Sequence, residues 1–144
     1  MGFPNTVFGY IKVEGDINKA LEKIEQLPSV TAKEWPPMPR EMFSVVNHSD
    51  SLVSYKDEHI VHFGMCVKEI NYEWATWLER FEALFKSMKA TEAFVVLQIV
   101  YWDSGEFDGR FYYKWSLGWS DEIPVTERTL DNQVWIFAGS PREF

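Results

Sequence analysis

The side chains best suited to metal or nucleophilic chemistry are few, namely the three histidines His48, His59 and His62 and the single cysteine Cys66. His59 and His62 have the H-x-x-H spacing of a metal-binding pair. The apolar residues around them favour a strand, however, and side chains three apart on a strand point to opposite faces. On a helix the two rings could meet. Because no further Cys or His lies nearby to complete a tetrahedral set, we expect no metal site.

Cys66 would need a base within hydrogen-bond reach to act as a nucleophile. On one face of a strand, His62 and Cys66 would be about 13 Å apart at roughly 3.3 Å per residue, so they do not form a local dyad. Lying between Met65 and Val67, Cys66 is expected to be a small buried hydrophobic side chain.

The acidic stretch 103–109 is superficially similar to a calcium-binding loop. Placing Gly109 at the invariant glycine puts Trp115 where the closing glutamate belongs, so a hairpin turn is expected instead. The sequence contains no glycine-rich phosphate loop, dinucleotide fingerprint or H-E-x-x-H motif, and we expect no cofactor and no catalytic residue. Hydrolysis by a pair of loop carboxylates stays open, because the sequence does not give their separation in space.

Charge and aromatic content favour a protein partner. The chain has 14 Lys and Arg against 22 Asp and Glu, a formal net charge of -8, which repels nucleic acid and anionic lipid and attracts basic surfaces. Aromatic residues make up 17% of the chain, and Trp and Tyr supply rigid contact area at interfaces. The simpler interpretation is an acidic surface that favours solubility, with the rings in the core. The residues that we expect to contact a basic protein are Asp103, Glu106, Phe107, Asp108, Trp119, Asp121 and Glu122.

The first third of the chain predicts a strand, a helix and a loop. The strand covers 7–13, and the helix after it is capped by Asp16 and ended by Pro28. The segment 29–40 holds three prolines around Trp35 and is predicted to be an extended loop. The apolar face of the helix is predicted to contain Ile17, Ala20, Leu21, Ile24 and Leu27.

The middle of the chain predicts two strands and the clearest helix. The strands cover 42–47 and 59–69 and are separated by a polar turn region at 48–58, in which residues 52–55 could pair. Asn71 is expected to cap the helix that follows. Its apolar residues recur at steps of three and four: Trp74, Trp77, Leu78, Phe81, Leu84, Phe85 and Met88.

The last third predicts three strands. The first, 94–102, is almost continuously apolar and is expected to lie in the centre of the sheet, whereas 111–117 alternates between apolar and polar residues. A long acidic loop over 118–132 leads to the final strand, 133–138. The element order is βαββαβββ, and we expect one α+β domain over 1–144, with a mixed or antiparallel sheet packed against two helices.

The compartment follows from the cysteine count and from hydropathy. A single cysteine cannot form an intrachain disulfide, and a reducing cytoplasm is the simplest location. We see no secretory signal. The longest apolar stretch, 93–102, is about half of what a membrane helix needs, so we expect a soluble cytoplasmic protein that does not enter the membrane.

Three segments carry a resemblance to a known family. They are the opening strand with Phe8-Gly9-Tyr10 and the helix after it, the run Val100-Tyr101-Trp102-Asp103, and the closing strand Gln133-Val134-Trp135-Ile136-Phe137. In these segments the chain resembles the small α+β immunity proteins encoded beside bacterial polymorphic or contact-dependent toxins. The resemblance implies a cytoplasmic inhibitor that binds one cognate toxin domain and has no catalytic activity.

The leading hypothesis is therefore an immunity protein that occludes a basic toxin site. The runner-up is a small-ligand or regulatory module in which Trp35, Trp115 and Trp119 line an apolar pocket. The third is the hydrolase with loop carboxylates.

Overall fold

The computed structural model describes residues 4–45, 57–100 and 107–143, with the backbone alone for residues 100, 107 and 108. The protein is an α+β domain with the expected element order βαββαβββ. Short 3-10 turns lie between several of these elements. The helices and strands are β1 (Pro4–Glu14), α1 (Ile17–Glu25), β2 (Phe43–Val45), β3 (Glu58–Lys68), α2 (Trp74–Lys86), β4 (Ala90–Val100), β5 (Phe107–Gly118) and β6 (Val134–Gly139).

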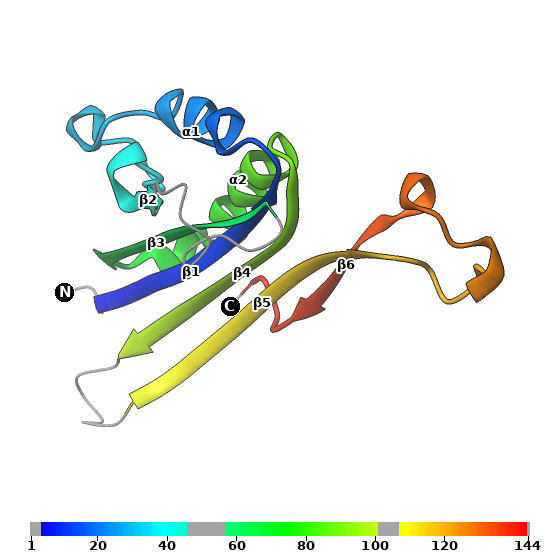
Figure 1. Cartoon of the computed structure of the whole chain (residues 1–144). Coiled ribbons are helices and arrows are strands. Elements are labelled where there is room, and N and C mark those ends of the chain that lie inside the picture. Colours follow the sequence, from blue (N-terminus) through cyan, green and yellow to red (C-terminus); the bar gives the residue numbers. More distant parts are fainter. Residues whose placement is uncertain (1–3, 46–56, 101–106, 144) are drawn as a thin grey trace.

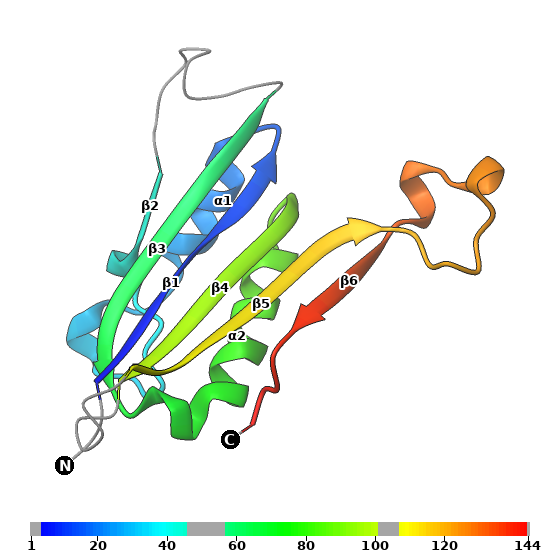
Figure 2. The same ribbon diagram turned by 90° about the horizontal axis from the view of Figure 1, so that it is seen from below.

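The strands form one six-stranded sheet in the order β2-β3-β1-β4-β5-β6. Every neighbouring pair is antiparallel. Both helices lie on the same face of the sheet (Figure 1). In the described parts of the chain, no helix lies over the opposite face, which is seen in Figure 2. The protein therefore has two layers, one of helices and one of strands.

The helix α2 supplies most of the core between the two layers. All seven side chains of its predicted apolar face are buried, and three of its rings stack in succession, with centroids 5.0 Å apart for Trp74 and Trp77 and 5.3 Å apart for Trp77 and Phe81. Full burial of one such side chain stabilises the fold by about 1.5–3 kcal/mol. The predicted cap is wrong. A 3-10 turn over Ile70–Glu73 precedes the helix, and the Asn71 backbone N–H donates to the buried Asn5 side chain at 3.0 Å.

The helix α1 begins as the sequence predicts. The Asp16 carboxylate accepts a hydrogen bond from the Asn18 N–H at 2.9 Å, which satisfies one free donor of the first turn. Ala20 and Ile24 are buried, and Ile17 packs against the core from the edge.

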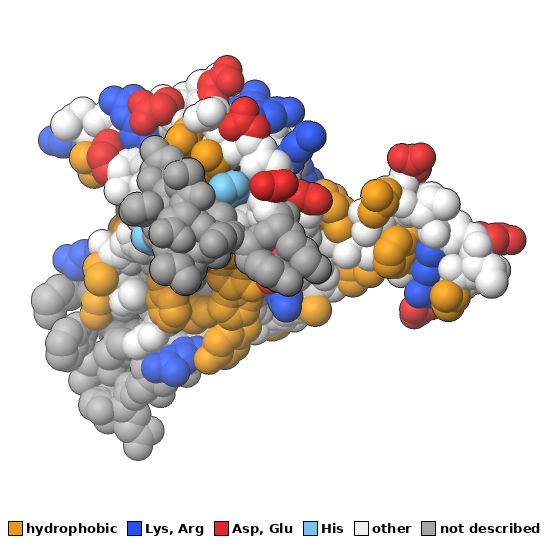
Figure 3. Space-filling view, in the orientation of Figure 1, with side chains coloured by type: hydrophobic (Ala, Val, Ile, Leu, Met, Phe, Trp, Pro, Cys, Tyr) orange, Lys and Arg blue, Asp and Glu red, His pale blue; other side chains and the backbone are white. Residues whose placement is uncertain are grey.

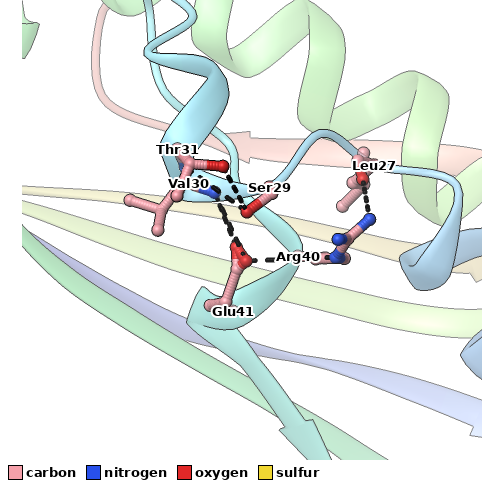
Figure 4. A network of polar contacts seen from close by, with 6 residues as sticks. All are labelled: Leu27, Ser29, Val30, Thr31, Arg40 and Glu41. Atoms are coloured by element: carbon pink, nitrogen blue, oxygen red, sulfur yellow. Dashed lines mark hydrogen bonds and ion pairs between the residues drawn. The ribbon is translucent and has the colours of Figure 1, made fainter.

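The proline-rich segment 29–40 is a folded loop with two 3-10 turns, η1 (Val30–Ala32) and η2 (Arg40–Met42), at its ends. A hydrogen bond joins the two ends of the loop: the Val30 N–H donates to the Glu41 carboxylate at 2.6 Å (Figure 4). The α2 side chains Trp77 and Arg80 donate to the carbonyls of residues 37 and 36 at 2.8 Å and 2.6 Å. The segment forms no α-helix and no β-strand, and hydrogen bonds from α2 hold it in place.

The strand β5 alternates as predicted, and β1 alternates in the same way. Val7, Ile11, Tyr113 and Trp115 point into the core and are at most 1% exposed. Gly9 lies on the same side as Val7. The polar turn region at 48–58 is described only from residue 57 onward, so His48 and the pairing expected at 52–55 lie outside the described residues.

Candidate binding surface

The predicted contact residues lie at the two ends of β5. Phe107 and Asp108 are the first two residues of β5, whereas Trp119, Asp121 and Glu122 follow its last residue. At roughly 3.3 Å per residue, the 11 steps from residue 108 to residue 119 span about 36 Å along the strand. One compact contact cannot include both groups, so a surface that joins them has to run the length of β5. The two remaining predicted contact residues, Asp103 and Glu106, lie outside the described residues.

Residues 119–133, which we call the arm, project from the end of the sheet beyond β5 and β6 (Figure 1). The arm is held by contacts within itself. The Trp119 Nε1–H donates to the Thr129 carbonyl at 2.8 Å, and the Arg128 guanidinium lies 5.9 Å from the Trp119 ring centroid. The Asn132 side chain accepts from the Thr129 N–H at 2.9 Å and donates to the Glu127 carbonyl at 3.0 Å. Trp119 therefore has a structural role in the arm, and its indole edge is already engaged.

The outer surface of the arm is acidic and apolar together. Asp121 and Glu122 are exposed, as predicted for contact residues. Val125 and Leu130 are 75% and 81% exposed, respectively, and hydrophobic and acidic side chains alternate over the arm in Figure 3. The other exposed carboxylates of the arm are Glu127 and Asp131.

The uncovered face of the sheet, which we call the open face, carries a row of aromatic rings. Its residues include Phe8, Tyr10, Lys12, Ile60, His62, Cys66, Glu92, Phe94, Val96, Tyr112, Lys114 and Ile136. Three rings follow one another across β1, β4 and β5, with centroids 5.7 Å apart for Tyr10 and Phe94 and 6.3 Å apart for Phe94 and Tyr112. Phe8 and Tyr112 are 41% and 46% exposed. The outer faces of antiparallel sheets are usually polar, so a continuous aromatic row is typical of an interaction surface.

Ion pairs accompany the rings. The Tyr10 hydroxyl donates to the Glu92 carboxylate, whose other oxygen lies 3.6 Å from the Lys114 ammonium. Burial, together with the hydrogen bond and the charge of Glu92, raises the pKa of Tyr10 to about 12. Lys12 pairs with Glu58 at 3.5 Å. Lys12 and Lys114 are thus each paired with a carboxylate, and apolar contact area is the main feature of this part of the open face.

The sequence contains the signal for this row, although the site was not predicted from it. Phe8 and Tyr10 alternate with buried Val7 and Ile11, so they must face away from the core. Tyr112 lies opposite the predicted core side of its strand in the same way. What the sequence could not give is the strand order that places β1, β4 and β5 side by side.

Two of the histidines, His59 and His62, lie on β3 together with Cys66. His62 points to the open face, where the Ser44 hydroxyl is 2.9 Å from its Nδ1, and His59 points to the other face, as the strand spacing predicted. The prediction for Cys66 is wrong, because its side chain is exposed on the open face, 3.9 Å from the Thr6 hydroxyl. Odd-numbered residues of β3 face the core, which places residue 66 outside. Among the described residues, no group of three His, Cys, Asp or Glu side chains is arranged to hold a metal ion.

The three tryptophans of the small-ligand hypothesis lie in different parts of the fold. Trp115 is 1% exposed and packs against Phe81 and Phe85 under α2, so it has almost no surface left for a ligand. Trp35 is 52% exposed in the proline-rich loop, and Trp119 is bound within the arm.

Comparisons of the chain with protein-family models, with curated proteins and with solved structures found no match. Within the described parts of the chain, none of the helices combines the length and the apolar character that crossing a membrane requires.

Proposed function

We propose that the protein is a non-catalytic binding protein, and that it is a cytoplasmic immunity protein that occludes a basic site on a cognate bacterial toxin domain. The observation that carries this proposal is the aromatic row on the open face, together with the acidic arm that projects from one end of the sheet. A contact surface with a ring-rich centre and charged edges has the anatomy of a specific protein interface.

The rings supply the affinity in this proposal. They lie on three adjacent strands of the sheet, so they are preorganised and lose little conformational freedom on binding. Tyr and Trp side chains in the centre of an interface commonly cost 2 kcal/mol or more when truncated, which is about a 30-fold loss of affinity. Tyr112 has the largest exposed fraction of the row, 46%, and is the ring that a partner would cover most fully.

The carboxylates supply the preference for a basic partner. The arm contains four exposed carboxylates and one cationic side chain, Arg128. Such a local excess of negative charge accelerates association with a basic surface and has less effect on dissociation.

The experiment uses as its partner the toxin domain that this proposal predicts to be encoded by the neighbouring gene. The domain is produced with the wild-type chain, with Tyr112→Ala, or with Tyr72→Ala, and growth of the host and the dissociation constant of the purified pair are measured. Tyr72 is the matched control because it is 70% exposed and precedes α2, away from the open face. We expect Tyr112→Ala to weaken binding by about 30-fold and reduce protection, and Tyr72→Ala to behave as wild type.

Two results would contradict the proposal. Failure of the wild-type chain to bind the domain or to protect the host would remove the immunity function. Equal binding by both variants, with folding checked by circular dichroism, would remove the open face as the contact surface.

A further inference from the structure

The edge strand β6 lacks the features that usually protect an exposed strand. It is the last strand in the sheet order and pairs only with β5. No other described segment lies along its outer side (Figure 2). Its six residues, Val-Trp-Ile-Phe-Ala-Gly, include no charge and no proline, the residues with which proteins normally prevent edge pairing.

Exposed apolar side chains are concentrated on and beside β6. Of the eleven exposed large hydrophobic residues in the described part of the chain, five lie between residues 125 and 137. Three belong to β6, with exposed fractions of 46% for Val134, 43% for Ile136 and 38% for Phe137. They occupy both faces of the strand, since Ile136 lies on the open face and Phe137 contacts Trp115 on the helix side. A partner that adds a strand here would cover both sets at once.

The free hydrogen-bonding groups of β6 can be located. The Ser140 N–H donates to the Tyr112 carbonyl at 2.9 Å, just after the strand ends. Because hydrogen-bonded and non-hydrogen-bonded residues alternate in antiparallel pairs, the even-numbered residues of β6 bond to β5. The amides of Trp135 and Phe137 then point away from the sheet, toward an added strand.

We propose that this edge pairs with β6 of a second copy of the chain, antiparallel about a two-fold axis, so that two sheets join into one. Two-fold pairing uses the same strand of both copies, with residue i opposite residue j and j opposite i, so the exposed apolar side chains of each face meet apolar side chains of the second copy. The strand itself is uncharged, and no like charges are opposed along it.

The charges beside the strand favour the same arrangement. In an antiparallel pair the two acidic arms lie at opposite ends of the joined strands, which keeps their carboxylates apart. Each arm instead approaches the C-terminal end of β6 in the second copy. Arg142 lies there, 34% exposed and paired with the Glu82 carboxylate, with its guanidinium 4.5 Å from the Phe137 ring centroid. A parallel arrangement would oppose the two arms directly.

The experiment compares Ile136→Lys with Ile60→Lys, measured by light scattering after gel filtration. Both isoleucines are 43% exposed on the open face, but Ile60 lies on β3, away from β6. We expect the wild type and Ile60→Lys to have twice the 16.9 kDa chain mass, and Ile136→Lys to have the mass of one chain. Circular dichroism and thermal unfolding check that both variants fold, and Val134→Lys repeats the test at a second exposed position of the strand.

Hydrogen exchange identifies the surface itself. The amides of Trp135 and Phe137 should be protected in the wild-type dimer and should exchange rapidly in Ile136→Lys. The inference is overturned by a wild-type chain that stays monomeric up to its solubility limit, by an Ile136→Lys variant that remains dimeric, or by rapid exchange at both amides in the dimer. It does not depend on the toxin experiment, because it needs no partner other than the chain itself.

Discussion

The Tyr10 hydroxyl is the most perturbed ionisable group of the open face. It donates to the Glu92 carboxylate, and burial and the negative charge of that carboxylate both oppose loss of its proton. The folded-state pKa, about 12, lies above the ordinary tyrosine value of 10.0. The folded protein therefore holds this proton more tightly than the unfolded chain does, and the resulting stability is fully present below pH 10.

Tyr10→Phe is predicted to change the alkaline pH dependence of stability. Between pH 10 and about 12 the unfolded chain releases the Tyr10 proton while the folded chain keeps it, so the free energy of unfolding falls as pH rises. Phe cannot lose a proton, and the variant should show a smaller decline over this window, measured by urea unfolding at pH 8 and at pH 10.5. Tyr72→Phe, at an exposed tyrosine, is the control. A decline as steep in Tyr10→Phe as in the wild type would contradict this assignment.

At the scale of the elements, Gly9 is the described glycine at which an added Cβ atom would meet its nearest neighbour at the shortest distance. A Cβ atom there would overlap the Phe94 carbonyl oxygen on β4 and would lie 2.9 Å from Phe63 Cζ on β3. The sheet therefore depends on the missing side chain at this position, because the obstructing atom on β4 belongs to the backbone and cannot rotate away.

Gly9→Ala is accordingly predicted to destabilise the fold by about 1–3 kcal/mol or more, through displacement of β4. Gly64→Ala is the matched control, since its Cβ would lie 3.6 Å from the Val7 carbonyl oxygen and 3.7 Å from Phe8 Cβ, in ordinary contact. Chemical unfolding of the two variants measures the difference. Equal stability would mean that β1 and β4 are farther apart than described.

Local patterns predicted the elements and a sheet packed against two helices, but they gave no strand order. The apolar face predicted for α2 and the alternation of β5 are periodic over short stretches, and both were confirmed. Six of the seven predicted residues lie on the helix, and the seventh, Met88, is buried just after it. Asn71 was wrong as a cap because it lies within a 3-10 turn, Ile70–Glu73, and α2 begins only after that turn. Cys66 was placed in the core because its neighbours are apolar. In β3, however, the odd-numbered residues face the core, and the even-numbered residues, which include Cys66, face away from it. The aromatic row depends on strand order, which sequence periodicity does not contain.

At the scale of the whole molecule, the net charge of -8 has to be separated from its local distribution. A uniform negative field would attract a basic partner to any surface, whereas a contact at the arm requires the charges to be near the bound partner. Reversing two carboxylates changes the net charge from -8 to -4 wherever the pair lies, since each Glu or Asp to Lys change adds two units. Position is then the only variable between two such variants.

Asp121→Lys/Glu122→Lys on the arm is therefore compared with Glu22→Lys/Glu25→Lys on the exposed side of α1. With the arm at the rim of the contact, the first variant should bind the toxin domain about tenfold more slowly at low salt, with little change in dissociation rate, and the second should differ from wild type much less. The difference in association rate should shrink as salt is raised, because the Debye length falls below about 10 Å when the ionic strength exceeds about 0.1 M. Stopped-flow association at two ionic strengths measures both effects. Equal slowing by the two variants would mean that the total charge attracts the partner and that the arm is no closer to it than α1.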